Sequence, residues 1–349
     1  MTFFTEKWAI VKMNLENILL VRKSKKNIFL EKIIESSEKN KEIANDVLEE
    51  YDVALSQPNI IYIIYQNQEK HLILNVLKEN KTEKIKLTLE PLPDIFDLNI
   101  ETKDKEIHIF YLLRLGDRIG KYEINHHYYD GSKWRDYLVE EIQVGKALNP
   151  IKILPIDRGV LLSYYRNEKE IVIKRFSTEK LEWSNAINLV VSNTEKLYLD
   201  MIMIDSIIHL TYCEFMDGNL VVKYSKLNIE HKDKTYEEQY ISNEGSPSHP
   251  TIIYFSNKLW ITWVELNKVI SRCSDDKGET WGALYMWNNS RNIDFIRYKY
   301  ISMDKEDDKI LNNSFGSIYP EISFIGFGNV EDATEIPLKK KTFMTLTRI

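Results

Sequence analysis

The sequence is poor in cysteine, glycine and proline, which number 2, 12 and 9 among its 349 residues. Two cysteines, Cys213 and Cys273, cannot build a disulfide scaffold or, by themselves, a four-thiolate zinc site. No Gly/Ser/Pro-rich tract interrupts the middle of the chain. We therefore expect one large domain over residues 1–349, although the length alone suggests two.

The chain also lacks the marks of membrane, secreted and nucleic-acid-binding proteins. Its apolar runs are far shorter than the roughly 18 residues that span a bilayer. The segment Met1–Trp8 has no basic stretch followed by an apolar one, so we expect no secretory signal and a cytoplasmic location. Association with a cell surface by a non-classical route stays open. A net charge of −6 argues against nucleic acid as a partner, because nucleic acid selects a basic surface.

Aromatic and β-branched residues are abundant, and they are arranged in a repeat. A short strand-like segment recurs five times and ends each time in one polar residue, which we call the marker. The markers are spaced by 48 to 52 residues and are Gln66, Arg114, Arg166, Glu214 and Glu265. Further strand-like segments precede and follow each copy. Four antiparallel strands in each unit of 40 to 50 residues are typical of an all-β fold, the β-propeller.

The two ends of the chain are predicted to share one blade. Asn17–Lys23 and Asn27–Glu35 form a hairpin with Arg22 in the marker position, and Tyr319–Ile322 and Phe343–Ile349 supply two further strands, with Arg348 near the marker position. This arrangement closes the ring without an exposed edge and gives six blades. If the terminal segments build separate blades, the ring has seven.

Two stretches do not follow the repeat. Residues 36–50 place Ile43, Ala44, Val47 and Leu48 at helical spacing, with Ser36 or Ser37 as an N-cap, and predict a short helix between blades. Residues 288–317 contain a dense charge run and are predicted to form a solvated loop insertion.

The second strands carry aromatic residues that would suit either sugar stacking or packing between blades. The aromatic residues in question are Tyr164, Tyr165, Tyr212, Trp260 and Trp263. Tyr164, Tyr212 and Trp263 align in one column with the aliphatic residues Leu20, Ile64 and Leu112, which favours packing. The pair His126-His127 cannot readily bind one metal together, because adjacent strand residues face opposite sides.

One turn of the fifth unit carries a specific motif. The segment 274–281 reads Ser-x-Asp-x-Gly-x-Thr-Trp, with its fixed positions at Ser274, Asp276, Gly278, Thr280 and Trp281. The carboxylate can accept backbone N–H bonds across the turn, glycine permits a positive φ, and the indole can pack between blades.

With this motif inside this repeat, the chain resembles the Asp-box (bacterial neuraminidase repeat) propellers, typified by the six-bladed sialidases. The resemblance implies that the Asp-box residues are structural and that ligands bind on the opposite face. Sialidases use an arginine triad, a Tyr–Glu nucleophile pair, an Asp acid/base and an Arg-Ile-Pro motif. The nearest string here, Arg118-Ile119-Gly120, falls in a turn. The chain is thus similar to a diverged member without the catalytic set.

The markers end on the face opposite the Asp-box turn, so they are the first candidates for a site. Arg22, Arg114 and Arg166 would grip a carboxylate or phosphate. Glu214 and Glu265 would serve as glycosidase acid and nucleophile if about 5 Å apart. The competing interpretation is that these charges only mark where strands meet water. His249, at the start of a strand on the same face, is the best lone histidine candidate.

These observations favour a non-catalytic binding propeller that recognises a carbohydrate or a protein ligand on that face. The alternative is a diverged sialidase-like glycoside hydrolase that uses Glu214 or Glu265 with Arg114 and Arg166. Convergence of these side chains on one pocket would favour the hydrolase. No spacing typical of metal ligands or of cofactor loops is present, so neither a metal nor a cofactor is expected. The sequence leaves the ligand and the oligomeric state open.

Overall fold

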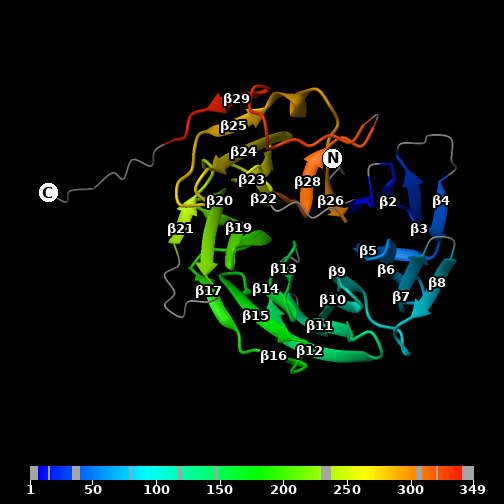
Figure 1. The fold of residues 1–349 in the computed structure, drawn as a ribbon. Helices are drawn as coiled ribbons and strands as arrows, with labels where there is room; N and C mark the ends of the chain where they lie inside the picture. The colour runs from blue at the N-terminus through cyan, green and yellow to red at the C-terminus, as the bar shows by residue number, and fades with distance from the viewer. Residues whose placement is uncertain are drawn as a thin grey trace.

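The computed structural model describes residues 7–14, 16–33, 40–78, 81–116, 120–145, 148–228, 237–303, 309–319 and 321–339, without the side chain of Glu237. This part of the chain folds into strands β1 to β29 and one short 3-10 helix, Asn288–Arg291. The strands belong to five sheets, which are arranged as a ring (Figure 1).

The first two sheets contain the N-terminal strands. The first sheet has the order β28 (Asn313–Gly316), β26 (Ile296–Ser302), β1 (Trp8–Lys12), β2 (Ile18–Ser24), β3 (Asn27–Lys32) and β4 (Lys41–Ala44). The second sheet has the order β5 (Val47–Ser56), β6 (Ile60–Asn67), β7 (Leu72–Lys78) and β8 (Lys81–Lys86).

The third sheet holds two units of the repeat. One unit consists of β9 (Ile95–Lys103), β10 (Glu106–Arg114), β11 (Lys121–Tyr129) and β12 (Trp134–Gln143). The other consists of β13 (Ile151–Ile156), β14 (Gly159–Asn167), β15 (Glu170–Ser177), β16 (Glu182–Trp183) and β17 (Ile187–Val191). A single residue pair, Gln143 with Asn167, joins the two units.

The last two sheets complete the ring. The fourth has the order β18 (Lys196–Ile204), β19 (Ile207–Met216), β20 (Asn219–Asn228) and β21 (Glu237–Tyr240). The fifth has the order β27 (Lys309–Ile310), β22 (Ser248–Phe255), β23 (Lys258–Glu265), β24 (Lys268–Ser274), β25 (Leu284–Trp287) and β29 (Ala333–Ile336).

This arrangement is a β-propeller, as the repeat predicts. Each marker lies at or near the end of a second strand, in β6, β10, β14, β19 and β23. The aligned column of second-strand residues is fully buried, from Leu20 at 0% exposed to Trp263 at 1%. These side chains belong to the cores between sheets, so the packing interpretation of the column is confirmed and sugar stacking by them is excluded.

The ring is closed by a strand within the segment for which the charge run predicts a loop. Within residues 288–317, β26 pairs in parallel with β1, so that Trp8 lies opposite Tyr298, and β28 pairs with β26. The loop prediction is therefore wrong for β26, β27 and β28. In β26 the buried Tyr298 and Tyr300 alternate with Arg297 and Lys299, which is the alternation of a strand. Because the alternate residues are charged and a charge run follows, the segment resembles a solvated loop in the sequence.

The predicted C-terminal strands do not contribute in the expected way. The described residues of 319–322 lie outside every strand, although Ile325 makes one bridge to Phe315. The segment Phe343–Ile349, with Arg348, lies outside the described residues.

The helix predicted over 36–50 is also wrong where the structure describes it, since residues 41–44 belong to β4 and residues 47–50 to β5. Ser36 and Ser37 lie outside the described residues. The register of β5 against β6 shifts between Val47 and Tyr51. Ile43 and Ala44 end β4 and Val47 and Leu48 begin β5, so two strand ends separated by two residues have the spacing of a helix.

The Asp-box turn joins β24 to β25 and is braced by its own side chains. The Asp276 carboxylate accepts the Thr280 N–H at 2.8 Å, the Thr280 hydroxyl at 2.6 Å and the Ser274 hydroxyl at 2.7 Å. These bonds lower the pKa of Asp276 to about 2. Gly278 has a φ of +89°, and Trp281 packs edge-on against Tyr224 of the adjacent sheet. The turn thus fixes the contact between the fourth and fifth sheets.

Candidate functional site

A cavity of about 740 Å³ lies at the centre of the ring and is lined by its innermost strands. Its wall comes from β1, β26, β5, β9 and β13 and from residues 309–313, which include β27 and the start of β28, with Leu199 of β18 and His249 of β22. Cavities of this size commonly hold small ligands.

One end of this cavity lies on the face opposite the Asp-box turn. His249 lies at the start of β22, and Tyr254 lies near the other end of that strand. Tyr254 is opposite Leu259 of β23, and Leu259 is opposite Ser274 of β24. Ser274 opens the Asp-box turn. The starts of the inner strands therefore form a rim on the other face, where the markers also end.

The rim carries a row of residues in left-handed conformation. Asp97, Asn149, Tyr198 and His249 have φ between 49° and 60°, and each lies at or next to the start of an inner strand. They are 49 to 52 residues apart, so they follow the repeat. Asp97, Asn149 and His249 line the cavity, and the Tyr198 ring lies 4.4 Å from that of His249. Left-handed non-glycine residues are uncommon and gather at ligand sites.

Carboxylates of the inner strands hold neighbouring strands together. Asp52 of β5 accepts the Ile100 N–H of β9 at 2.9 Å. Asp200 of β18 accepts the Ile252 N–H of β22 at 3.0 Å. Each acidic side chain thus satisfies a backbone donor in the next unit around the ring, which is a structural role.

Three lysines of the cavity wall are each neutralised by a carboxylate. The pairs are Lys7 with Glu50 at 2.6 Å, Lys152 with Asp200 at 2.8 Å, and Lys299 with Asp52 at 2.9 Å. Burial lowers the pKa of Lys299, but the attraction of Asp52 and Glu101 outweighs it, so the pKa is raised overall. Each of these lysines is therefore held in an ion pair.

Two other wall residues have shifted pKa values. Burial raises the pKa of Asp97 to about 6, against the opposing attraction of Lys7. Burial, together with the positive charge of Arg297, lowers the pKa of His249 to about 3. The imidazole of His249 is therefore neutral at pH 7. The Asp97 carboxyl, with a pKa of about 6, begins to take up protons as the pH falls below 7.

The arginines predicted from the marker positions do not line this cavity. Arg22 donates to Glu31 at 2.7 Å, and Arg166 donates to Asn188 at 3.2 Å. Arg114 is exposed at the end of β10. Of the predicted ligand-binding residues, only His249 belongs to the cavity wall.

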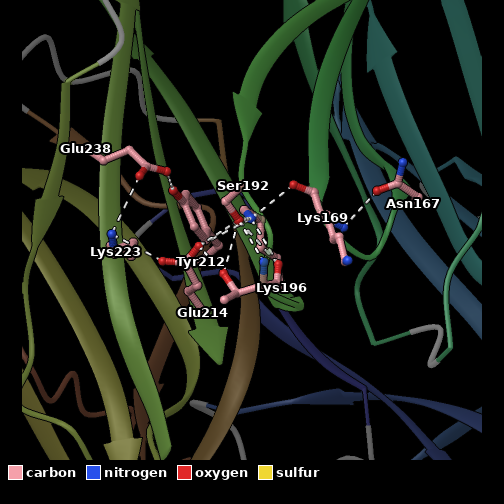
Figure 2. Close-up of polar contacts among 9 residues, drawn as sticks. Asn167, Lys169, Ser192, Lys196, Tyr212, Glu214, Lys223 and Glu238 are labelled. Carbon is pink, nitrogen blue, oxygen red and sulfur yellow. Dashed lines mark hydrogen bonds and ion pairs between the residues drawn. The ribbon is translucent and has the colours of Figure 1, made fainter. Parts of the chain in front are cut away.

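Glu214 lies inside a buried polar network between the third and fourth sheets (Figure 2). Its carboxylate accepts the Ser192 and Thr194 hydroxyls at 2.9 and 2.6 Å. It also pairs with Lys196 at 3.3 Å and with Lys223 at 3.2 Å. The lysine charges and the hydroxyl bonds oppose the effect of burial, so the pKa of Glu214 is lowered. The Glu214 carboxylate therefore binds protein side chains with both of its oxygens and stabilises the fold.

Glu265 has a different environment from Glu214. It lies at the end of β23 in the fifth sheet, where its carboxylate covers Gly245. Neither glutamate lines the cavity. The two side chains therefore do not meet the convergence criterion that the hydrolase alternative requires.

The cavity residues themselves were missed by the sequence analysis, apart from His249. The positions of Asp97 and Asn149 could have been predicted from the sequence, because the two residues are spaced by the period of the markers and lie at the beginning of inner strands. Arg297 and Lys299 lie in the segment that was predicted to be loop.

Within the described ranges, no group of three or more His, Cys, Asp or Glu side chains is arranged to hold a metal ion. The same part of the chain contains no helix long and apolar enough to span a membrane.

Comparison with known proteins gives fold similarity only. No family model matches the sequence, and no curated protein matches it. Among solved structures, the six-bladed fucose-recognising lectin of Aleuria aurantia is 11% identical, with a TM-score of 0.47 over 80% of this chain and 95% of that one. AofleA from Arthrobotrys oligospora is 9% identical, with a TM-score of 0.47 over 81% and 86%. A Bacteroides ovatus GH43 protein from a xyloglucan locus is 9% identical, with a TM-score of 0.38 over 69% and 53%. Similarity at this level carries no information about ligand or activity.

Proposed function

We propose that this chain is a non-catalytic binding propeller that takes a polar ligand, a carbohydrate or a protein loop, at the rim of its central cavity. The observation that carries the proposal is the row of left-handed residues along this rim. Asp97, Asn149 and His249, which carry a carboxylate, an amide and an imidazole, line the cavity at equivalent points of the repeat. Convergent polar groups in a cavity of this size are typical of a binding site.

The charges in the cavity support binding rather than catalysis. The lysines of the wall are paired with carboxylates, and Asp52 also satisfies a backbone donor. Glu214 and Glu265 lie outside the wall. A hydrolytic pair of carboxylates needs two acids that face one substrate bond.

We also infer that the ring has six blades, forms one domain and is related to the Asp-box propellers. Support for six comes from the groups of antiparallel strands that begin at β1, β5, β9, β13, β18 and β22. Support for the relationship comes from the bonds of Asp276 within its turn. A cytoplasmic location remains part of this proposal.

A glycan array tests the carbohydrate arm. Asp97→Asn keeps the volume of the side chain and its tolerance of a left-handed backbone, but it removes the carboxylate. Asp104→Asn is the matched control, because Asp104 has a φ of 55° and lies exposed in the turn between β9 and β10, away from the rim. We expect any glycan bound by the wild type to bind at least tenfold more weakly to Asp97→Asn and unchanged to Asp104→Asn. Equal loss in both variants would contradict a site at the rim.

The absence of catalysis is tested with a fluorogenic panel of sialosides and other glycosides. We expect no product above the buffer rate. Product formation that is lost in Glu265→Gln would overturn the binding-only proposal.

A further inference from the structure

Arg297 of β26 differs from the other basic residues of the cavity wall. Its Nε donates to the Thr251 hydroxyl at 3.0 Å, which fixes the plane of the guanidinium. Thr251 is itself completely buried and donates to the His249 carbonyl at 3.1 Å. In the part of the chain that the structure describes, Arg297 forms no ion pair, so its two terminal nitrogens have no carboxylate partner.

An uncompensated guanidinium in a partly enclosed cavity is unfavourable on its own. Burial lowers the pKa of Arg297, with Asp200 acting in the opposite direction, but Asp200 is already paired with Lys152. Removing a charge from water costs free energy unless a counter-charge replaces the lost hydration. Lys7, Lys152 and Lys299 receive that counter-charge in an ion pair, whereas Arg297 forms none with the residues that the structure describes.

The charges of the cavity wall are balanced once the carboxylates that pair with its lysines are counted. The chain carries a net charge of −6. The wall contains three acidic side chains, Asp52, Asp97 and Glu101, against five basic ones. The basic side chains of the wall are Lys7, Lys152, Arg297, Lys299 and Lys309. Glu50 and Asp200, which do not themselves line the cavity, pair with Lys7 and Lys152, so five basic side chains face five acidic ones. Attraction of an anion therefore depends on Arg297 itself rather than on the charge of the whole wall.

We propose that Arg297 anchors an anionic group, a carboxylate or a phosphate, of a small ligand that binds in the central cavity. This inference rests on the proposed function and gives the chemical class of its ligand. The two terminal nitrogens, which have no carboxylate partner among the described residues, match the spacing of two oxygens on one carboxylate or phosphate, which permits a bidentate pair. The His249 imidazole also lines the cavity, and burial together with the Arg297 charge lowers its pKa to about 3, so it carries no charge that would compete for the anion at neutral pH.

The test is isothermal titration calorimetry with four probes: inorganic phosphate, D-glucuronate, D-glucose 6-phosphate and D-glucose. The second and third probes separate a carboxylate from a phosphate on a similar sugar ring, and the fourth lacks an anionic group. We expect at least one anionic probe to bind the wild type and to bind Arg297→Gln at least tenfold more weakly. Arg114→Gln is the matched control, because Arg114 is exposed and does not line the cavity. Its affinities should equal those of the wild type.

The outcomes separate this inference from the proposed function. If no anionic probe binds the wild type, or if Arg297→Gln binds it with equal affinity, the anion site is wrong. If D-glucose or an array glycan binds and depends on Asp97 but not on Arg297, the binding function stands and the anion site falls. If Arg297→Gln does not fold, Arg297→Lys replaces it, because lysine keeps the positive charge but cannot form a bidentate pair. We expect at least tenfold weaker binding by that variant, and unchanged affinity would overturn the proposal.

Discussion

The Nδ1 atom of His108 and the Nε2 atom of His126 lie 3.1 Å apart in the core between β10 and β11. Both residues are 1% exposed, and their rings are nearly parallel, with an angle of 7° between them. His126 also stacks on Phe110 and packs edge-on against Phe176. One ring nitrogen must donate to the other, so the pair requires a neutral acceptor.

This histidine pair predicts that the protein loses stability in mild acid. Burial lowers the pKa of both His108 and His126 below the ordinary value of 6.5. Because these imidazoles take up protons less readily in the folded than in the unfolded chain, they stabilise the fold above pH 6.5. That stabilisation is lost as the pH falls toward the folded-state pKa. The same applies to buried His209, whose pKa is about 4. For each histidine that stays neutral in the folded state, the free energy of unfolding falls by about 1.4 kcal/mol when the pH is lowered from 7.5 to 5.5.

Urea unfolding at these two pH values measures the loss. His126→Phe keeps an aromatic ring among Phe110 and Phe176 but removes one titrating group. We expect its free energy of unfolding to fall less between pH 7.5 and 5.5 than that of the wild type. An equal fall in both proteins would show that the pair does not produce the acid sensitivity.

Glu214→Gln is expected to destabilise the fold strongly. The substitution leaves the ammonium groups of Lys196 and Lys223, 0% and 6% exposed, without their shared carboxylate. Breaking a buried ion pair from one side costs about 3 kcal/mol. Glu265→Gln is the matched control at the equivalent marker position and should change the free energy of unfolding by less than about 0.5 kcal/mol. Chemical denaturation of both variants at pH 7 checks the difference, and similar values would refute a structural role specific to Glu214.

Gly278→Ala tests the close contact at the Asp-box turn. Gly218 and Gly278 have φ of +87° and +89°, so a side chain strains either backbone by about 1 kcal/mol. A Cβ at Gly278 would also overlap the Tyr224 hydroxyl, which is held by His209 at 2.8 Å, whereas a Cβ at Gly218 meets nothing within 4 Å. We expect a total cost of about 3 kcal/mol for Gly278→Ala and of about 1 kcal/mol for Gly218→Ala. Thermal unfolding of the two variants measures it, and equal melting temperatures would mean that the turn yields without cost.

The sequence by itself determined the features that depend on neighbours along the chain. The period of the markers predicted the propeller, because each unit repeats the same alternation of buried and exposed residues. The Asp-box turn was predictable because Ser274, Asp276 and Thr280 bond to one another within seven residues. The opposite directions of His126 and His127 followed from strand geometry alone, and the two side chains indeed have separate partners, Phe110 and Asp136.

Only the tertiary structure decided how the ring closes and which side chains reach its centre. The strand that closes the ring pairs Trp8 with Tyr298, and no local pattern reports a contact between residues so far apart. The helical spacing within residues 36–50 is produced by the end of β4 and the start of β5, which belong to different sheets. Whether a cavity cation is neutralised depends on the neighbouring sheet, which supplies Asp52 to Lys299 but no carboxylate to Arg297 among the residues described. The markers remain outside the cavity because they end the second strands, and the first strands line the centre.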